Sequence, residues 1–553
     1  MTRPNLDRLV EGWRGPLLAA LVALLAGLPG LLLLPPLDRD EARFAQVTAQ
    51  MLETGDFIDL RFQDQGHYRK PAGVHWLQAM AVSAVSEVEA RDIRPYRLPS
   101  LLGAMLAAWA CAWGGAALFG ARAGFLAGAM LGATFLLSTL AGIATTDAVL
   151  AGAITLAMAA LGRIYVAASG GMSATRPIKL AFWLGLAVSI LIKGPVGPLV
   201  AGLTLVSLGV WDRRWAWMKD LGWGWGLVIV GLVAAPWAFA ITVTTDGAFW
   251  GESIGADILA KLWPGRGDWG LPGQYLLLAP LLFFPATLLL PAALGAGWTR
   301  RAEPAIRFAV CWLVPCWLLF EIVPTKLWHY VLPLFGALAW LAAAAATRPM
   351  DRWSLRLGVV LSLLGGLLVA VFTLYGLGEY GTASAQTWAS LAIGLALVGA
   401  AVSGFLLANR VAVSALLTAM AFGLIAHAGL AGVIRQLQPL WVSPRLDRAL
   451  ISTELHPRAG QLAGPVAVAG YYEPSVVFLT GTETELTDAA GAARAVREGR
   501  PAVVDRSLEA PFREALARDG GDARAVGTVE GRNYSNGDRV ALTLYRPQSE
   551  GGR

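Results

Sequence analysis

The chain has 553 residues, of which 56% are hydrophobic and only 15% are charged. A soluble domain carries roughly a quarter charged residues, so this composition excludes a soluble globular protein. The net charge of +6 does not indicate a nucleic-acid partner, because the basic residues form short clusters between apolar runs, which is the pattern of membrane topology signals.

Apolar runs long enough to cross a membrane recur from residue 16 to residue 433. A hydrocarbon core about 30 Å thick needs about 20 apolar residues per helix, and long runs without alternation favour helices over a barrel. The first run has no small-residue cleavage site, so it predicts a retained helix rather than a signal peptide. We expect an α-helical polytopic membrane protein with about thirteen helices, at 16–37, 98–119, 123–141, 146–167, 178–193, 195–211, 222–244, 272–297, 307–324, 327–346, 355–377, 387–408 and 411–433.

Arginine and lysine residues predict the orientation of these helices. With the N-terminus inside, most of the short connections that carry basic clusters also fall inside, as the positive-inside rule requires. The long connections 38–97 and 245–271 then lie outside. An odd number of helices also places the C-terminal segment outside.

Charged residues return from about residue 435 onward, and no further spanning run follows. We therefore expect a transmembrane domain at 1–434 and an extracytoplasmic α/β domain at 435–553. Apolar stretches predict about four strands and charged amphipathic stretches predict two helices. The strands are expected in GPVAVAGYY, SVVFLTG, RPAVVD and RVALTLYR, and the helices in DAAGAARAVREG and APFREALARDG. With no phosphate-binding loop or metal-ligand spacing, this domain is interpreted as a stabilising or acceptor-guiding cap.

Ionisable residues gather on the predicted outer face, although they come from distant parts of the chain. Such residues are costly near a membrane and mark a functional site by default. The topology brings together Asp38, Arg39, Asp40, Glu41, Arg43, Asp147, Lys193, Lys261, Arg266, Asp268, Lys326 and His329. This convergence predicts a cavity at the outer leaflet.

A phosphate at headgroup depth is the ligand that suits such a cavity. Arginine binds phosphate bidentately and lysine acts as a point charge. A nearby carboxylate can accept a proton from an incoming hydroxyl group. Inverting sugar transfer needs one such base, and a phosphate leaving group needs no protonating acid.

The first outer loop also resembles a known family. Asp40-Glu41-Ala42-Arg43-Phe44, then AQVTAQMLETGDF and YRKPAGVHW, is similar to the first outer loop of GT-C type membrane glycosyltransferases. The group includes the lipid A aminoarabinose transferases, the rhizobial galacturonosyltransferases and, more distantly, the protein O-mannosyltransferases. Three later motifs in the same order share this resemblance, namely ATTDAVL at 144–150, LIKGPVG at 191–197 and TKLWHYVLPLF at 325–335.

The resemblance implies a role for each candidate residue. Asp40 is the expected principal catalytic carboxylate, and Asp147 is a second acid of the site. The donor phosphate is expected to contact Arg43, Lys70 and Lys193. The substrate cavity is expected to include Glu41, Tyr68, Arg266, Lys326 and His329.

Two positions depart from the family pattern. Arg69 stands where some members have a glutamate that can take part in a metal site. No cofactor follows from the sequence, and this departure disfavours a divalent metal while leaving the question open. Phe44 replaces a tyrosine that aminoarabinose transferases often have, which removes one hydroxyl contact.

Each candidate also has a purely structural interpretation. A carboxylate at a helix start can cap it, a basic residue can anchor at the interface or at a helix end, and a histidine can be packed in the core. These alternatives apply to Asp40 and Asp147 as caps, Arg43 and Lys70 as anchors, Lys193 as a helix-end cation, His329 as a packed histidine, and Arg266 as a partner of Asp268.

The sequence thus predicts an inverting glycosyltransferase of a bacterial inner membrane, with its site facing the periplasm. Its expected partners are membrane lipids, a polyprenyl phosphate sugar donor such as undecaprenyl phosphate, and an acceptor. The acceptor is lipid A or core lipopolysaccharide, another envelope glycan, or a protein hydroxyl. The alternatives are a transporter or flippase for a lipid-linked sugar, expected to show repeats and midplane sites, and a non-catalytic scaffold with dispersed acids.

Overall fold

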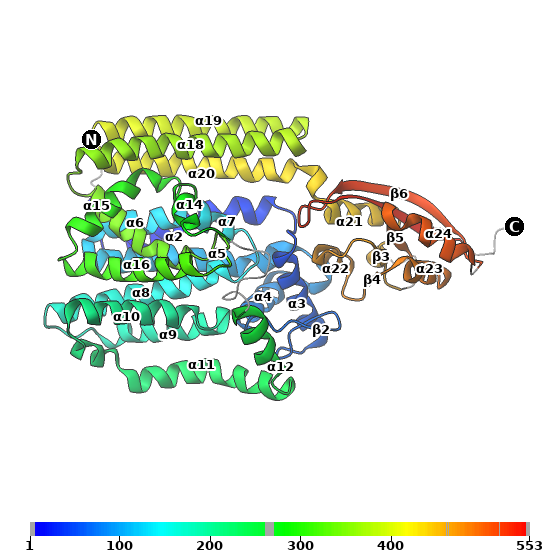
Figure 1. Cartoon of the computed structure of the whole chain (residues 1–553), viewed down its shortest axis with the longest axis horizontal. Coiled ribbons are helices and arrows are strands. Elements are labelled where there is room, and N and C mark those ends of the chain that lie inside the picture. Colours follow the sequence, from blue (N-terminus) through cyan, green and yellow to red (C-terminus); the bar gives the residue numbers. More distant parts are fainter. Residues whose placement is uncertain (1–5, 260–269, 460–461, 463, 519, 549–553) are drawn as a thin grey trace.

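Long helices lie side by side in a bundle, and a small sheet domain extends from one end of it (Figure 1). The computed structural model describes residues 6–259, 270–459, 462, 464–518 and 520–548. The first long loop, with helices α3 and α4, lies at the same end as the sheet domain.

Eight helices in the described part of the chain are long and apolar enough to cross a membrane. Two bent pairs raise this number to ten if each pair is one span, with bends of 60° in α6–α7 and 119° between α14 and the helical segment 286–299. The chain is therefore a multi-pass membrane protein. The eight are α2 (Arg14–Leu33), α5 (Ile93–Phe119), α8 (Asp147–Ser169), α11 (Trp223–Thr244), α16 (Pro304–Ile322), α18 (Arg352–Tyr380), α19 (Ala383–Ala408) and α20 (Ala412–Gln436).

All thirteen expected segments contain helix, but several are bent, short or charged. The bent pairs have the bounds α6 (Ala121–Ala133) with α7 (Phe135–Ala141), and α14 (Gln274–Leu282) with η4 (Ala286–Leu289) and α15 (Leu290–Thr299). The remaining three expected segments are α9 (Arg176–Lys193), which carries three basic residues, and the shorter α10 (Val196–Asp212) and α17 (Phe335–Ala346). Short and bent helices can still belong to a bundle because neighbouring helices bury them.

The turn between α9 and α10 confirms two separate helices there. Gly194 has a φ of +63°, a conformation that is easy for glycine and costly for other residues, and it ends α9. Pro195 directly precedes α10, where a fixed φ favours helix initiation. The Lys-Gly-Pro sequence therefore fixes the position of Lys193 at the end of α9.

Glycines allow the central helices α5 and α8 to approach each other closely. A methyl group at Gly103 of α5 would lie 2.6 Å from Cα of Val149 in α8. A methyl group at Gly152 would lie 2.5 Å from the carbonyl oxygen of Gly103. Small residues at such contacts drive helix association in membranes, where no hydrophobic effect between helices is available.

The first long loop folds as two helices and a small hairpin. It consists of α3 (Asp40–Thr54), β1 (Arg61–Phe62), β2 (Gln65–Gly66), α4 (Gly73–Val85) and η1 (Val88–Ala90). A buried polar chain joins α3 to α4, because Thr48 bonds both His75 Nδ1 at 2.8 Å and Gln78 Oε1 at 2.7 Å. The His75 ring also stacks on Phe44, with 5.2 Å between ring centroids.

A buried ion pair fastens this loop to the helical bundle. Glu41, 2% exposed, accepts two hydrogen bonds of 2.7 Å from Arg97 of α5, which is fully buried. Glu41 also accepts the backbone N–H groups of Leu37 at 2.9 Å and Ala144 at 2.7 Å. The remaining Arg97 N–H groups donate to carbonyl oxygens at the end of α2 and just beyond it, including that of Leu34 at 2.6 Å. The pair therefore joins α2, α3, α5 and the segment before α8.

The C-terminal sheet has five strands in the order β4-β3-β5-β7-β6. Strands β4, β3 and β5 are parallel, and β5, β7 and β6 are antiparallel. Helices α23 and α24 pack together and share a buried core with β3 and β5. The bounds are α21 (Val442–Ser452), β3 (Ala467–Ala469), α22 (Pro474–Thr480), β4 (Glu485–Thr487), α23 (Ala489–Arg497), β5 (Ala502–Asp505), α24 (Glu509–Arg518), β6 (Ala523–Arg532) and β7 (Arg539–Pro547).

The prediction of a strand in SVVFLTG is wrong, because this stretch forms helix α22. Every residue of α22 is buried, and a short run that is apolar on all sides has no periodicity that separates a helix from a strand. Pro474 is the first residue of α22, a position that proline favours. The sequence also missed β4 and β6. Strand β6 carries Arg524, Glu530 and Arg532 and pairs only with β7, as suits a charged edge strand.

The remaining short elements connect the larger ones. They are α1 (Leu6–Leu9), η2 (Ala216–Leu221), α12 (Ala248–Trp250), η3 (Gly251–Leu259), η5 (Leu332–Leu334), η6 (Gln438–Leu440), η7 (Pro457–Ala459) and η8 (Arg506–Leu508).

Replacing Arg97 tests the importance of the buried pair. Arg97→Met leaves the Glu41 charge buried and unpaired, which costs about 3–5 kcal/mol, so the thermal unfolding temperature of the detergent-solubilised protein should fall sharply. Arg94→Met is the matched control, since Arg94 pairs with Asp92 at the surface with its side chain 57% exposed, and surface pairs contribute about 1 kcal/mol or less. Equal unfolding temperatures for the two variants would contradict this assignment.

Candidate active site

A cavity of about 400 Å³ opens where α8 begins and α9 ends. One part of its wall is apolar and includes Leu150, Val196, Leu199, Phe249, Trp250 and Phe320. The other part is charged and contains Arg69, Lys70, Asp147, Lys193 and His329. Such a combination suits a ligand that has both a lipid chain and an anionic group.

Asp147 lies at the centre of the charged wall. Lys193 Nζ is 2.5 Å from Asp147 Oδ1, and His329 Nε2 is 3.7 Å from the same oxygen. Lys70 also interacts electrostatically with this carboxylate. The Lys193 ammonium lies 5.5 Å from the ring centroid of Tyr330, a cation–π distance. Sequence-distant motifs thus meet at one carboxylate.

Arg69 and Arg43 extend the basic charge from the cavity toward the start of α3. Arg69 Nε is 4.0 Å from Glu252 Oε1 of η3. Burial lowers the pKa of Arg43; the neighbouring Arg69 guanidinium lowers it further, whereas Asp40 raises it. Arg43 therefore lies within electrostatic range of both Asp40 and the cavity residue Arg69.

Asp40 is exposed as the first residue of α3 and does not line this cavity. No side-chain hydrogen bond caps α3, and none caps α8, where Asp147 is the first residue. Lys193 is more than a helix-end cation, because its ammonium is bonded to Asp147.

Three of the residues expected in the substrate cavity have other surroundings. Glu41 is buried and paired with Arg97, since a carboxylate that is shielded from solvent needs a charged partner. Lys326 is buried and donates to the carbonyl oxygens of Glu321 at 2.8 Å and Val323 at 2.7 Å, at the end of α16. Tyr68 donates to Asp59 at 2.9 Å; burial and the Asp59 carboxylate raise the pKa of Tyr68 to about 12. The expected cavity residue Arg266 lies outside the described residues, as does its partner Asp268.

No group of three His, Cys, Asp or Glu side chains that could hold a metal ion occurs in the described part of the chain. At the position where a metal-binding glutamate was considered, Arg69 faces Glu252 instead. We therefore assign no residue to a metal.

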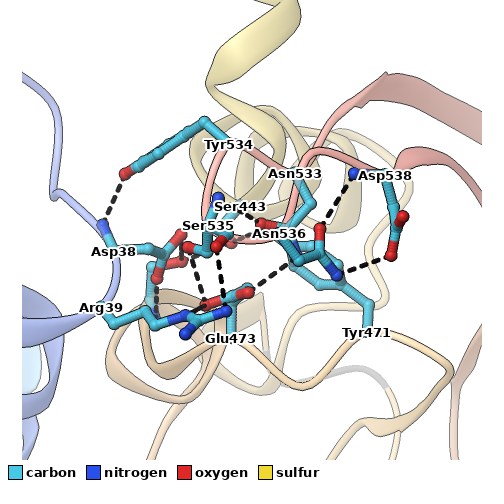
Figure 2. Close-up of polar contacts among 11 residues, drawn as sticks. Asp38, Arg39, Ser443, Tyr471, Glu473, Asn533, Tyr534, Ser535, Asn536 and Asp538 are labelled. Atoms are coloured by element: carbon cyan, nitrogen blue, oxygen red, sulfur yellow. Dashed lines mark hydrogen bonds and ion pairs between the residues drawn. The ribbon is translucent and has the colours of Figure 1, made fainter. Parts of the chain in front are cut away.

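The sheet domain forms hydrogen bonds and an ion pair with the two residues immediately before Asp40 (Figure 2). The Asp38 carboxylate accepts hydrogen bonds from Ser475 N at 2.9 Å and Ser475 Oγ at 2.7 Å, and Asp38 N donates to Tyr534 Oη at 2.6 Å. Arg39 Nη2 donates to the Ser535 carbonyl oxygen at 3.1 Å, and Arg39 Nε is 3.9 Å from Glu473 Oε2. Both residues that precede Asp40 are thus held by the C-terminal domain.

The comparisons with known proteins agree with this geometry. No family model matches the chain. The chain is 29% identical over 364 residues to the undecaprenyl phosphate-alpha-4-amino-4-deoxy-L-arabinose arabinosyl transferase of Pseudomonas paraeruginosa, covering 62% of this chain and 63% of that protein. It is 28% identical over 376 residues to the enzyme of the same name from Erwinia tasmaniensis, covering 65% of each. The chain thus spans slightly less than two thirds of the curated relatives it matches.

The solved structures identify the fold. The crystal structure of ArnT from Cupriavidus metallidurans bound to undecaprenyl phosphate superposes with a TM-score of 0.76 at 21% identity, covering 95% of this chain and 97% of that one. The apo Archaeoglobus fulgidus oligosaccharyltransferase gives a TM-score of 0.50 at 10% identity, covering 91% of this chain and 70% of that one. This protein has the GT-C fold. The GT-C resemblance of the four motifs is therefore confirmed, together with the fold class and the small C-terminal α/β unit.

The candidate site contains residues that the sequence analysis did not single out. Tyr330 directly follows His329 in the TKLWHYVLPLF motif, so its place in that motif was an available signal. Phe249 and Trp250, which line the cavity, and Glu252, which pairs with Arg69, come from the second long loop, whose length was the only hint. Their contribution depends on how α12 and η3 fold over the cavity.

The contact at Asp38 should make stability depend on pH. Burial, with a smaller contribution from Glu473, raises the pKa of Asp38 from about 3.8 to about 7, against the opposing Ser475 hydrogen bonds. Because the pKa of Asp38 is raised on folding, the native state binds the proton of the Asp38 carboxyl group more tightly than the unfolded chain does. The stabilisation is therefore complete below about pH 4 and is lost as pH rises through about 7.

Asp38→Asn removes this titration, so its unfolding temperature should fall less than that of the wild type between about pH 4 and about pH 7. Thermal unfolding followed by tryptophan fluorescence measures the difference. Asp64→Asn makes the same change at an exposed position of the same loop and should keep the wild-type pH dependence. A wild-type slope in Asp38→Asn would show that this carboxyl is not the titrating group.

Proposed function

We propose that this protein is an inverting glycosyltransferase that moves a sugar from a polyprenyl phosphate carrier to an acceptor of the bacterial envelope. The observation that carries the proposal is the cavity in which Lys70, Lys193 and His329 surround Asp147 beside an apolar wall. The cations match a phosphate, and the apolar wall matches the isoprenoid chain attached to it. The names of the curated relatives and the ligand of the solved ArnT structure support undecaprenyl phosphate as the carrier.

The proposed reaction is a single displacement. The acceptor hydroxyl oxygen attacks the anomeric carbon and forms the new glycosidic bond. The bond between that carbon and the phosphate oxygen breaks, and its electron pair stays on the phosphate. The hydroxyl proton passes to a carboxylate base, and attack opposite the leaving group inverts the anomeric centre.

We assign the base role to Asp40, as the resemblance implies. Its exposed carboxylate begins α3, without a capping hydrogen bond, so it is available to an acceptor that arrives from outside. Lys70 and Lys193 would bind the donor phosphate within the cavity, and Arg43 would reach it from the side of Arg69. Asp147 would orient Lys193, and His329 would line the donor pocket. Glu41, Tyr68 and Lys326 would act indirectly, by holding the walls.

We propose that the site and residues 435–553 face the periplasm, with the N-terminus in the cytoplasm. Arg122, Arg348 and Arg410 line a cavity at the start of α6 and just after the ends of α17 and α19. This cluster of basic residues, at the opposite end of the bundle from the site, supports this orientation under the positive-inside rule. The hydrogen bonds to Asp38 and Arg39 support a role for the C-terminal domain in holding the loop that carries Asp40.

The transporter alternative is less well supported. A transporter is expected to bind its cargo near the membrane midplane, whereas the exposed Asp40 is the first residue of α3, and α3 lies at one end of the bundle beside the C-terminal domain. The scaffold alternative requires dispersed charges, whereas Asp147, Lys193 and His329 meet in one cavity.

Asp40→Asn tests the transferase proposal in cells. The change keeps the size of the side chain and removes the base, so transfer should fall by about 10²–10⁴-fold. Mass spectrometry of lipid A, envelope glycans and glycoproteins should show one sugar missing in both the deletion strain and the Asp40→Asn strain, while the carrier-linked sugar accumulates. The modified molecule identifies the acceptor and the sugar.

Asp64→Asn is the matched control, since Asp64 is exposed in the same loop. It should leave the sugar in place. A wild-type sugar profile in Asp40→Asn, together with a phenotype of the deletion, would refute the base assignment and favour the transporter or scaffold.

Lys70→Gln tests the phosphate site directly. Loss of one charge-assisted hydrogen bond, about 1.5–3 kcal/mol, should weaken binding of undecaprenyl phosphate to the purified protein at least about tenfold. Lys219→Gln removes an exposed lysine in η2, which does not line this cavity, and should leave the affinity unchanged. Equal affinities for the wild type and both variants would remove Lys70 from the donor site.

A further inference from the structure

A second cavity, of about 510 Å³, lies at the end of the bundle away from the candidate active site. It is formed at the start of α6, the end of α17 and the turn between α19 and α20. Three arginines from these separate segments line it, Arg122, Arg348 and Arg410, and none of its described lining residues is acidic. The proposed transfer reaction makes no use of this cavity.

The charges in this cavity are poorly compensated by the protein. Arg348 pairs with Glu303, with Nη1 and Oε1 3.2 Å apart. Within the described part of the chain, Arg122 and Arg410 have neither a hydrogen-bond partner for their side chains nor an ion pair. Arg410 also has a φ of +63°, in the region that favours glycine. An arginine thus occupies a position whose backbone favours glycine, and it lines the same cavity as two other exposed arginines.

An anion would complement these like charges, and the chemistry of the wall favours phosphate. Guanidinium groups bind phosphate bidentately. Beside the arginines lie apolar groups of Met350, Leu355 and Val413, which suit the glycerol and upper acyl segments of a lipid.

Aromatic residues place this end of the bundle at a membrane interface. Trp298 and Trp353 are 70% and 59% exposed. Arg301 lies 4.4 Å from the ring centroid of Trp298, and Arg356 lies 5.6 Å from that of Trp353. Exposed tryptophans beside basic residues are typical of the headgroup level.

We infer that this cavity binds a phosphate group, and that the headgroup of an anionic membrane lipid supplies it. Arg122 and Arg410 bind the phosphate oxygens, and Arg348 contributes charge from the side of Glu303. The inference is independent of the transferase activity, because no residue of the candidate active site takes part.

The test uses the purified, delipidated full-length protein, and the probe is phosphatidylglycerol, with diacylglycerol as the uncharged comparison. Native mass spectrometry measures the affinity for each lipid. Arg122→Gln/Arg410→Gln should weaken phosphatidylglycerol binding at least about tenfold, since it removes two charged donors. Arg122→Lys/Arg410→Lys, which keeps charge but not the bidentate geometry, should bind with intermediate affinity.

Arg352→Gln/Arg356→Gln is the matched control. It removes the same charge from the same end of the bundle, at two arginines that lie over Trp353 and not in the cavity. Its affinity should equal that of the wild type. Equal losses in both glutamine pairs, or no loss in either, would overturn the inference, because only general surface attraction would remain.

A thermal-shift arm separates the two sources of phosphate and controls for folding. Each variant is heated without lipid, with phosphatidylglycerol, and with inorganic phosphate. Stabilisation of the wild type by phosphatidylglycerol that is lost in Arg122→Gln/Arg410→Gln, from an unchanged lipid-free unfolding temperature, supports the lipid site. Stabilisation by inorganic phosphate with no further effect of the lipid would overturn the lipid source.

Discussion

The buried ion pair between Glu41 and Arg97 is the interaction on which the arrangement of the first long loop and the candidate site depends. Its two charges have no access to water, so the pair is stable only because every remaining polar atom is satisfied by backbone groups. Those backbone groups belong to the end of α2, the segment before α3, and Ala144. Asp40 precedes Glu41 directly, and Asp147 lies three residues after Ala144. This ion pair therefore fixes the backbone next to both candidate acids, Asp40 and Asp147.

The cavity beside this anchor works by a balance of opposite charges. Asp147 is held between Lys193, His329 and Lys70 in surroundings where the local dielectric is low and electrostatic interactions are strong. In the proposed reaction, a donor phosphate competes with Asp147 for the same ammonium groups. In that proposal the carboxylate would orient the lysine in the free site and limit how strongly the phosphate product is retained.

The C-terminal domain has a physical connection to this chemistry. Ser475, Tyr534 and Glu473 contact the two residues before Asp40, and helix α22 packs on α3 through a core that includes Phe478 and Ala45. The loop that carries Asp40 is thus attached to the helical bundle through Glu41 and Arg97, and it is also attached to the sheet domain. Two independent supports hold the backbone on both sides of Asp40, and an oriented base, as proposed for Asp40, would need such support.

Composition and hydropathy determined the membrane class, and the places of all thirteen helical segments, because burial in lipid demands long apolar runs. The predicted topology also placed Asp147, Lys193 and His329 on one face, because the segments that carry them end on the same side of the membrane. Local sequence could not assign α22, because a fully buried run lacks a period, nor β6, whose charges suit an edge strand.

Only the tertiary structure decided which polar residues face the cavity. The sequence predicts Glu41 in the site, but in the structure Glu41 pairs with Arg97, 56 positions away. Lys326 donates hydrogen bonds to carbonyl oxygens at the end of α16 instead of facing the cavity. Likewise, nothing in the sequence of residues 38 and 39 predicts Ser475 and Tyr534 as their partners. A side chain's hydrophobicity is a local property, whereas the partner that satisfies a buried charge is set by chain segments that meet only after folding.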